Sequence, residues 1–238
     1  MNYLMVLAIW MAMPHSSTNL FWSSLERAPH PSPGAEFSGA EKHLRERGLP
    51  IRHWTGAGFG ESAKTNRVIW VIVAGQNEQE IDSASLALLD GFVQEGGSIL
   101  ILVRSEAASA GARSLLRHYR IALNAEPVPA KTQLLSTSLL QGLRYCSPKT
   151  RLLDASEEAL NEMILVPNEL KQPTQNGAPN DRPGFRMILG KRAPGRIAVI
   201  TGAEAFSDAA VNATHQDREI KNNNLEILLR VCLWLGAS

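Results

Sequence analysis

The chain has 238 residues, 44% of them hydrophobic and 20% charged, which is enough for one sizeable α/β domain with an appendage. Its 24 basic and 23 acidic side chains give a formal charge of +1 and form no basic stripe, so we expect no nucleic-acid partner. Cys146 and Cys232 lie far apart and outside any metal-ligand spacing, which excludes a structural zinc site and leaves a disulfide between them as the less favoured alternative.

An apolar segment opens the chain at residues 3–13 and ends at Pro14. It is shorter than the roughly 20 residues of a transmembrane helix, but it fits the apolar core of a signal peptide or one half of a membrane anchor. A buried N-terminal helix is the alternative. The next segment is rich in Pro, Ser and Gly, which is typical of a linker. We therefore expect a signal or truncated anchor with membrane contact at 1–13, a linker at 14–35 and a single α/β domain at 36–238.

The domain is predicted to open with a helix and a short strand. Phe37, Ala40 and Leu44 fall on one helical face, and Gly48 ends the helix. The segment 49–54 then has the composition of a short strand.

Two buried strands joined by a helix come next. Residues 67–75 are the clearest strand, because six consecutive β-branched or aromatic residues indicate burial on both faces of a parallel sheet. The following helix is capped by Asp82 or Ser83 and ends at the glycine pair 96–97. The apolar residues 98–103 form the next strand, and this order predicts a right-handed parallel crossover.

The second half of the chain has weaker signals. From them we predict a helix and short strand at 108–124, strands at 151–155 and 162–168, a hairpin at 184–202 and a final helix at 222–236. Together the elements predict an α/β fold, a three-layer sandwich with a mainly parallel, flavodoxin-like sheet and a C-terminal hairpin plus helix. Ligands of such sheets bind beyond the carboxyl ends of the strands, which here are 74–77, 104–106 and 202–204.

Several motifs accompany these elements. A helix ends in FVQEGG before the strand SILIL, the last strand reads GRIAVITGAEAFSDAAV, and an Asn-containing loop, NNN, opens the final helix, which ends in WLG. With these motifs the chain resembles the noncatalytic branch of the class I glutamine amidotransferase-like superfamily. The resemblance covers residues 36–236 and is strongest at 68–103 and 195–236.

That branch includes bacterial membrane-tethered domains of unknown function, auxiliary proteins of gliding-motility ABC transporters and the N-terminal domain of an intraflagellar transport protein. The resemblance therefore implies a scaffold or binding domain instead of a known reaction. It also implies a bacterial protein that is membrane-anchored or extracytoplasmic (periplasmic), with a protein partner in a membrane or transporter assembly. A cytoplasmic location is the alternative.

An enzyme would need a nucleophile and a base, and the sequence supplies neither in a recognised motif. Active glutamine amidotransferases place a Cys on a glycine turn after a strand, whereas the equivalent turn here is LVRSEAAS. Ser105 with His215 as base and Asp208 or Asp217 as orienting group is the one arrangement to weigh. The favoured interpretation is that Ser105 caps the following helix and His215 is solvated, so we assign no catalytic residue.

Short polar side chains at the strand ends form the candidate binding site. Ser207 and Asp208 follow the last strand, and Asn222–Asn224 precede the final helix, where capping is favoured over ligand binding. No glycine-rich phosphate motif follows a strand, and we expect no cofactor and no metal. The alternative function is a hydrolase or transferase that uses Ser105 or Asp208. Our leading hypothesis is a noncatalytic domain that binds a protein or small ligand through Arg104, Ser105, Glu204, Ser207, Asp208 and Asn224.

Overall fold

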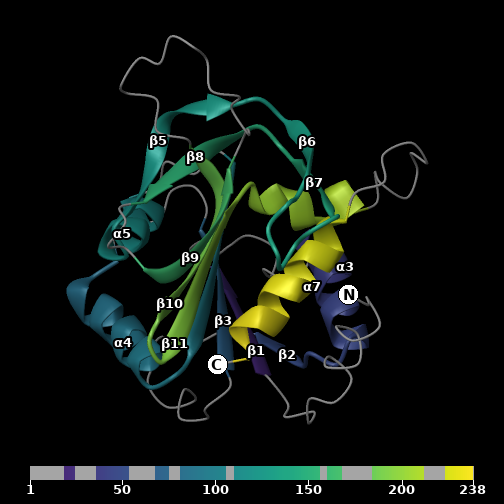
Figure 1. The fold of residues 1–238 in the computed structure, drawn as a ribbon. Helices are drawn as coiled ribbons and strands as arrows, with labels where there is room; N and C mark the ends of the chain where they lie inside the picture. Colours follow the sequence, from purple (N-terminus) through teal and green to yellow (C-terminus); the bar gives the residue numbers. More distant parts are fainter. Residues whose placement is uncertain are drawn as a thin grey trace.

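The computed structural model describes residues 19–24, 36–53, 68–74, 81–105, 110–155, 160–167, 184–211 and 223–237. They form a nine-stranded mixed sheet, a separate two-stranded sheet and helices on both faces of the large sheet (Figure 1). None of the described helices is long and apolar enough to cross a bilayer.

Five neighbouring strands of the large sheet are parallel. In order across the sheet they are β2 (Ile51–His53), β1 (Asn19–Ser24), β3 (Val68–Ala74), β4 (Ser98–Val103) and β11 (Gly195–Thr201). β3 and β4 are buried along their whole length, as their apolar composition predicts for strands covered on both faces. The parallel crossover between these two strands is confirmed.

The remaining four strands run antiparallel, so the sheet is mixed. β10 (Phe185–Arg192) pairs with β11, β9 (Asn161–Pro167) and β8 (Thr150–Ala155), and β5 (Ile121–Val128) pairs with β8. The prediction of a mainly parallel sheet therefore holds for one half and is wrong for the other. The reversal begins at the predicted hairpin, because the short turn between β10 and β11 joins only antiparallel strands.

β1 lies inside the segment predicted as a linker, residues 14–35. It pairs with β3 from Asn19↔Val68 to Ser24↔Val73 and with β2 on its other side. The structure thus corrects the linker prediction for residues 19–24, where three consecutive large apolar residues, LFW, favour a strand. The apolar segment predicted as a signal or anchor, residues 1–13, lies outside the described residues.

Helices cover both faces of the large sheet. Two of them, α4 (Ser83–Gln94) and α5 (Ala110–His118), pack on one face, and α3 (Ser38–Glu46) and α7 (Asn224–Leu235) pack on the other (Figure 1). Side chains of β4 alternate between the two layers: Ile99 and Ile101 pack with α4 and α5, whereas Leu100 and Leu102 pack with α7. As predicted, Asp82 caps α4, and its carboxylate accepts the N–H of Ser85 at 2.8 Å.

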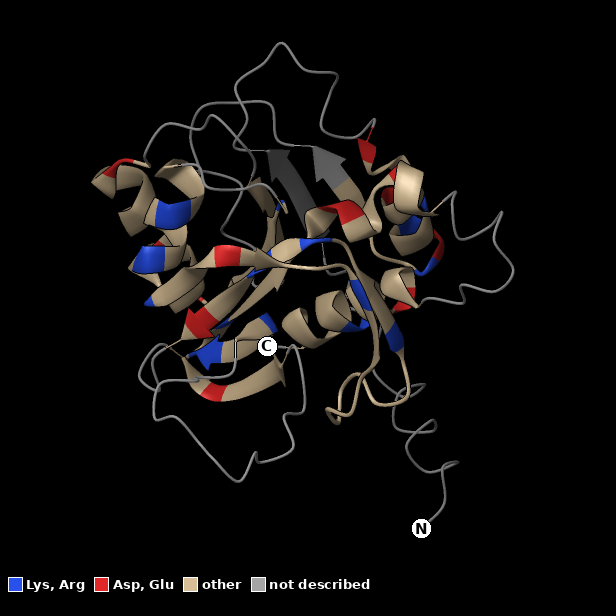
Figure 2. Ribbon diagram, turned by 90° about the horizontal axis from the view of Figure 1, so that it is seen from above, with Lys and Arg blue, Asp and Glu red and all other residues tan. Residues whose placement is uncertain are grey.

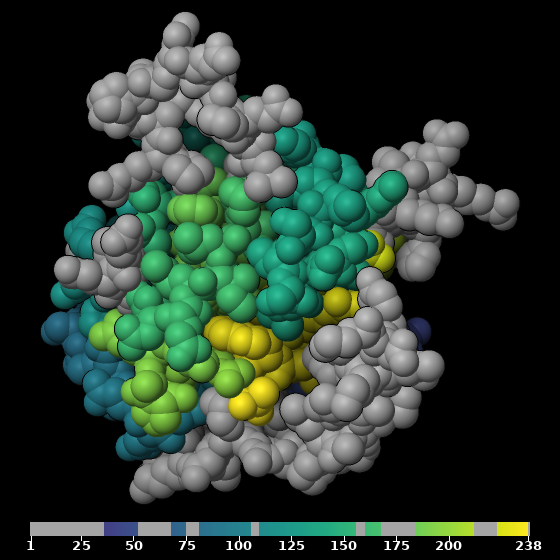
Figure 3. Space-filling model, viewed as in Figure 1, coloured from purple at the N-terminus to yellow at the C-terminus, as the bar shows by residue number. Residues whose placement is uncertain are grey.

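The second sheet consists of two short antiparallel strands, β6 (Lys131–Leu134) and β7 (Arg144–Ser147), and neither is predicted from the sequence. It lies near the N-terminal end of α7, and Figure 3 shows the teal and yellow surfaces of these segments in contact. The hydroxyl of the fully buried Tyr145 donates to the carbonyl of Thr201 at 2.9 Å, which ties β7 to the end of β11.

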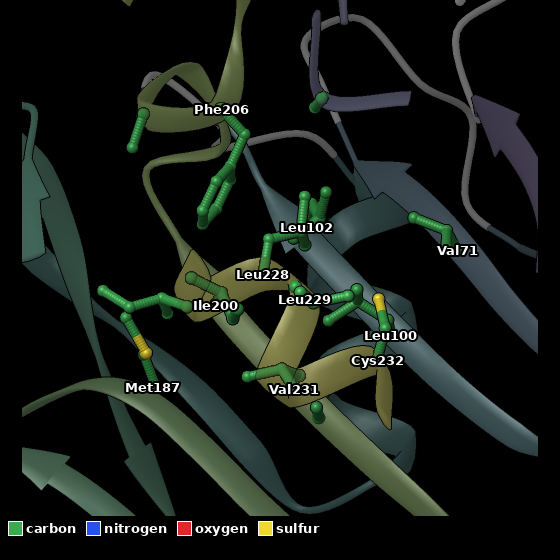
Figure 4. Packing of buried hydrophobic residues seen from close by; sticks show 14 of the residues in the cluster. Val71, Leu100, Leu102, Met187, Ile200, Phe206, Leu228, Leu229, Val231 and Cys232 are labelled. Carbon is green, nitrogen blue, oxygen red and sulfur yellow. The ribbon is translucent and has the colours of Figure 1, made fainter. Parts of the chain in front are cut away.

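The core on the α7 face is built from aliphatic side chains of the sheet and the helix. Figure 4 shows Leu228, Leu229 and Cys232 of α7 beside Leu100 and Leu102 of β4, all of them buried. Cys232 is fully buried in this core, and burial raises the pKa of its thiol to about 12. Both cysteines are free thiols.

Candidate functional site

The carboxyl ends of three parallel strands meet at one edge of the large sheet. Ala74 of β3 and Thr201 of β11 are both in register with Val103 of β4, so the three strands end together. The chain continues from these ends with Arg104 and Gly202, whose N–H groups donate to Ala74 and Val103 at 2.9 and 2.8 Å. We call this the carboxyl edge, and Figure 2 looks down on it from above. The predicted convergence of these strand ends is confirmed.

Glu204 and Ser105 are joined across this edge. Glu204 lies in the short 3-10 helix Ala203–Phe206 that follows β11. Both of its carboxylate oxygens lie 3.0 Å from the backbone N of Ser105, and one of them accepts the Ser105 hydroxyl at 2.6 Å. The carboxylate therefore fixes the turn after β4. The predicted role of Ser105 as a cap of the next helix concerns residues 106–109, which lie outside the described residues.

Arg104 lies beside Ser105 and binds Glu36 through two hydrogen bonds. The guanidinium NH1 and NH2 atoms lie 2.8 and 2.5 Å from the two carboxylate oxygens, and the guanidinium carbon is 5.7 Å from the centre of the Phe37 ring. The hydrogen bonds from Arg104 lower the pKa of Glu36, against the opposing effect of partial burial. The Arg104 side chain is 17% exposed and that of Glu36 is 45% exposed, so the pair reaches the surface.

Asp208 binds the beginning of α3. Its carboxylate accepts the N–H of Ser38 at 3.2 Å, the hydroxyl of Ser38 at 2.6 Å and the N–H of Gly39 at 2.6 Å. These are N–H groups that the first turn of a helix leaves without an intrahelical partner. Asp208 thus caps a helix that is remote in sequence, and its negative charge is attracted to the partial positive charge at the N-terminus of that helix.

Ser207 and Asn224 make local and tertiary hydrogen bonds. The Ser207 hydroxyl donates to the carbonyl of Glu204 at 2.8 Å and accepts the N–H of Ala210 at 3.4 Å, as a cap does. Asn224 is 2% exposed, and its amide donates to the carbonyls of Cys146 and Ala205 at 2.9 and 3.1 Å. Its side-chain oxygen accepts the N–H of Cys146 at 3.0 Å. Asn224 therefore connects α7 to β7 and to the 3-10 helix.

A buried polar group beside this edge was not predicted. Arg186 of β10 is 1% exposed; its guanidinium donates to the hydroxyl of Ser147 and to the carbonyl of Pro129. The carbonyl of Arg186 accepts the hydroxyl of Thr201 at 3.3 Å, and the Tyr145 hydroxyl binds the carbonyl of the same threonine. An arginine inside the otherwise apolar stretch FRMILG is the one sequence signal for this group.

The six predicted residues all lie at the carboxyl edge. Four of them are joined through the short helix Ala203–Phe206, and the other two, Arg104 and Asp208, bind the segment that opens the domain. Ser105 binds Glu204, Ser207 binds the backbone of Glu204, and Asn224 binds the backbone of Ala205 in the same short helix. Asp208 and Arg104 each bind the segment around Glu36 and Ser38.

The hydrogen bonds of this arrangement connect the strand ends to the neighbouring helices. His215 and Asp217, which the Ser105 hypothesis requires, lie outside the described residues. Within the part of the chain that the structure describes, no three His, Cys, Asp or Glu side chains are grouped so that they could hold a metal ion. The hydroxyl at the strand end is bound to a carboxylate that also binds the backbone, and this arrangement holds a turn in place.

The sequence matches no family model and no curated protein. Among solved structures the chain is similar to the mmIFT52 N-terminal domain, with a TM-score of 0.65, 18% identity, and coverage of 92% of this chain and 98% of that chain. It is also similar to exo-beta-1,4-mannosidase Op5Man5 from Opitutaceae bacterium strain TAV5, with a TM-score of 0.42, 12% identity, and coverage of 97% of this chain and 37% of that chain. The second likeness is too weak to support an argument.

The likeness to the mmIFT52 domain spans nearly the whole of both chains and shows a shared fold. It agrees with the predicted similarity in fold to the N-terminal domain of an intraflagellar transport protein. At 18% identity it shows the fold alone, because one fold can carry many functions.

Proposed function

We propose that this chain is a noncatalytic binding or scaffold domain whose carboxyl edge engages a protein partner. The observation that carries the proposal is the use of the Glu204 carboxylate, which binds both the hydroxyl and the backbone N of Ser105. Ser105, which occupies the position of a nucleophile at the strand end, is therefore held in the turn that follows β4. The shared fold with the mmIFT52 N-terminal domain is compatible with this proposal.

The surface offered to a partner consists of the groups at this edge that reach solvent. Glu36 is 45% exposed in its bond with Arg104, and Ser38 is exposed beside Asp208. These charged and hydrogen-bonding groups suit the polar part of a protein interface. Asn224, in contrast, is buried and bound on both sides of its amide, so we assign it to the support of the surface.

We extend the proposal to the setting of the domain. Residues 1–13 act as an export signal or membrane anchor, and the partner belongs to a membrane or transporter assembly. The chain derives from the glutamine amidotransferase-like superfamily and has lost the thiol of its nucleophile turn. The motifs around 68–103 and 195–236 support this part of the proposal.

Site-specific photo-crosslinking in cells tests the binding edge. A benzoylphenylalanine at position 36 is expected to form a covalent adduct with a protein partner, whereas one at Glu46 is not. Glu46 is a matched control, because it is an exposed glutamate at the other end of α3. Equal adducts at both positions, or none at position 36, would contradict the proposal.

A further inference from the structure

Side chains of the same chain close one edge of the two-stranded sheet. In β7, Arg144 donates its N–H to the side chain of Asn223 at 2.9 Å and accepts the N–H of Asn223 at 2.8 Å. Two residues further on, Cys146 makes a corresponding pair of hydrogen bonds with the side-chain amide of Asn224, at 3.0 and 2.9 Å. The backbone groups of Arg144 and Cys146 therefore point away from β6, and the two asparagines close this side of β7.

The backbone groups on the other side of the sheet, along β6, point outward. In an antiparallel ladder, two opposite residues direct their N–H and C=O groups either toward each other or away from each other, in alternation. Leu134 lies opposite Arg144, and Thr132 lies opposite Cys146. Because Arg144 and Cys146 point away from β6, Thr132 and Leu134 point away from β7. We call the N–H and C=O groups of these two residues the outer edge of β6.

The exposed fraction of Leu134 shows that the chain itself leaves this edge open. A further strand bonded to β6 would cover the residue, yet Leu134 is 68% exposed. Thr132 is exposed as well, and among the described residues only β7 pairs with β6. Figure 3 shows the teal surface of these two strands facing the viewer, beside the yellow surface of α7. β6 is thus an edge strand with accessible backbone groups.

The outer edge of β6 lacks the features that keep edge strands from pairing. Natural edge strands are protected by charged side chains, prolines or bulges. The residues Thr132, Gln133 and Leu134 are uncharged, and they pair with β7 without a register shift. The one charged residue of β6 is Lys131, at its first position. A sheet of two strands is marginally stable, and three or more strands stabilise each other, so β6 is suited to receive another strand.

We propose that β6 pairs with β6 of a second copy of this chain, so that two sheets of two strands join into one of four. Antiparallel pairing about Gln133 places Thr132 of each copy opposite Leu134 of the other, which is the self-matching contact of a two-fold axis. These are the residues whose N–H and C=O groups point outward. Every group of both outer edges then takes part in a hydrogen bond, and only residues of β6 are needed.

The side chains of β6 are compatible with this pairing. Thr132 and Leu134 are both exposed and, two residues apart, lie on the same face of the sheet. The Leu134 side chains of the two copies therefore lie diagonally across the axis, within reach of each other. Lys131 falls opposite Leu135 of the other copy, so no like charges face each other. The inference does not depend on the proposed function of the carboxyl edge.

Sedimentation velocity of the full chain over a range of concentrations tests the pairing. A small interface binds weakly, so we expect monomers at about 1 μM and dimers at about 100 μM. Leu134→Lys places two positive charges beside each other across the axis and should weaken the dimer about tenfold or more. Leu88→Lys is the matched control, because it makes the same change at another exposed leucine, 50% exposed and far from β6 on α4, and should leave the dimer unchanged.

Two further variants test the geometry. Thr132→Pro removes an N–H that points away from β7, so it should weaken the dimer while the circular dichroism spectrum stays that of the parent. In a Cys146→Ser background, which leaves the buried Cys232 as the one native thiol, a short bismaleimide should join two chains of Leu134→Cys. The same reagent should not join two chains of Leu88→Cys.

Several results would overturn the inference. One is a parent chain that stays monomeric at about 100 μM, and another is a dimer that Leu134→Lys and Leu88→Lys weaken equally or not at all. The last result also identifies association through another part of the chain. If Leu134→Lys does not fold, the cross-link at position 134 decides in its place. A monomeric parent in which benzoylphenylalanine at position 134 captures a different protein would assign the edge to a strand of that protein instead.

Discussion

Asn224 is expected to stabilise the carboxyl edge more than its neighbour Asn223 does. In β7, Cys146 directs both its N–H and its carbonyl to the Asn224 amide, at 3.0 and 2.9 Å. In an antiparallel strand these two groups of one residue point to the same side, so the amide takes the place of a neighbouring strand. The third hydrogen bond, to the carbonyl of Ala205 at 3.1 Å, fixes the short helix after β11.

Asn224→Ala removes these three hydrogen bonds. Each is worth about 1 kcal/mol net, and backbone groups left buried without a partner cost more, so we expect a loss of about 3 kcal/mol. That is a large part of the roughly 5–15 kcal/mol by which a domain is stable. The variant should therefore still fold, with a clearly lower denaturation midpoint.

Urea denaturation followed by tryptophan fluorescence and circular dichroism measures this loss. Asn223→Ala is the matched control, because its side chain makes one such bond, from the N–H of Arg144 at 2.9 Å. Its backbone N–H still binds the carbonyl of Arg144 after the substitution, so we expect a cost of about 1 kcal/mol or less. The reasoning fails if Asn224→Ala costs no more than Asn223→Ala.

Two further predictions concern ionisation and thiol access. The hydrogen bonds from Arg104 lower the pKa of Glu36, so this pair stabilises the fold above the carboxyl's ordinary pKa of 4.5 and loses its effect as the pH falls through the lowered value. Glu36→Gln should thus be less stable than the parent at pH 7 and equally stable in acid, and a difference that persists below pH 3 or so would count against the pair. In thiol titration at pH 8 the native chain should react at Cys146, which is partly exposed, while Cys232 stays protected until unfolding. Cys146→Ser should abolish the native reaction, and rapid labelling of Cys232 would show that the core around α7 opens.

The sequence predicts those elements whose structure follows from their own residues, without tertiary contacts. β3 and β4 are apolar along almost their entire length, and Asp82 caps α4 at the position that its spacing indicates. β6 and β7 carry polar, four-residue sequences without periodicity, and β7 is held by Asn223 and Asn224, more than 70 residues away. Such strands depend on tertiary contacts, which local patterns do not contain.

The same distinction applies to the candidate site. Parallel strands end at one edge, so the sequence predicts that residues after β4 and β11 meet there, and Ser105 and Glu204 do. The partners of the other charged residues come from the segment that opens the domain. Glu36 is 68 residues from Arg104, and Ser38 is 170 residues from Asp208. Only the folded arrangement of α3 against the edge reveals these pairs.

The central claim is that the strand end at Ser105 shapes a binding edge and performs no covalent chemistry. Incubation of the full chain with a fluorophosphonate, followed by intact-mass and peptide-level mass spectrometry, tests it most directly. We predict no adduct on Ser105 of the parent chain, because the hydroxyl is bound to the Glu204 carboxylate that holds the turn. An adduct on Ser105 of the parent that disappears in Ser105→Ala would contradict the account and support the hydrolase alternative.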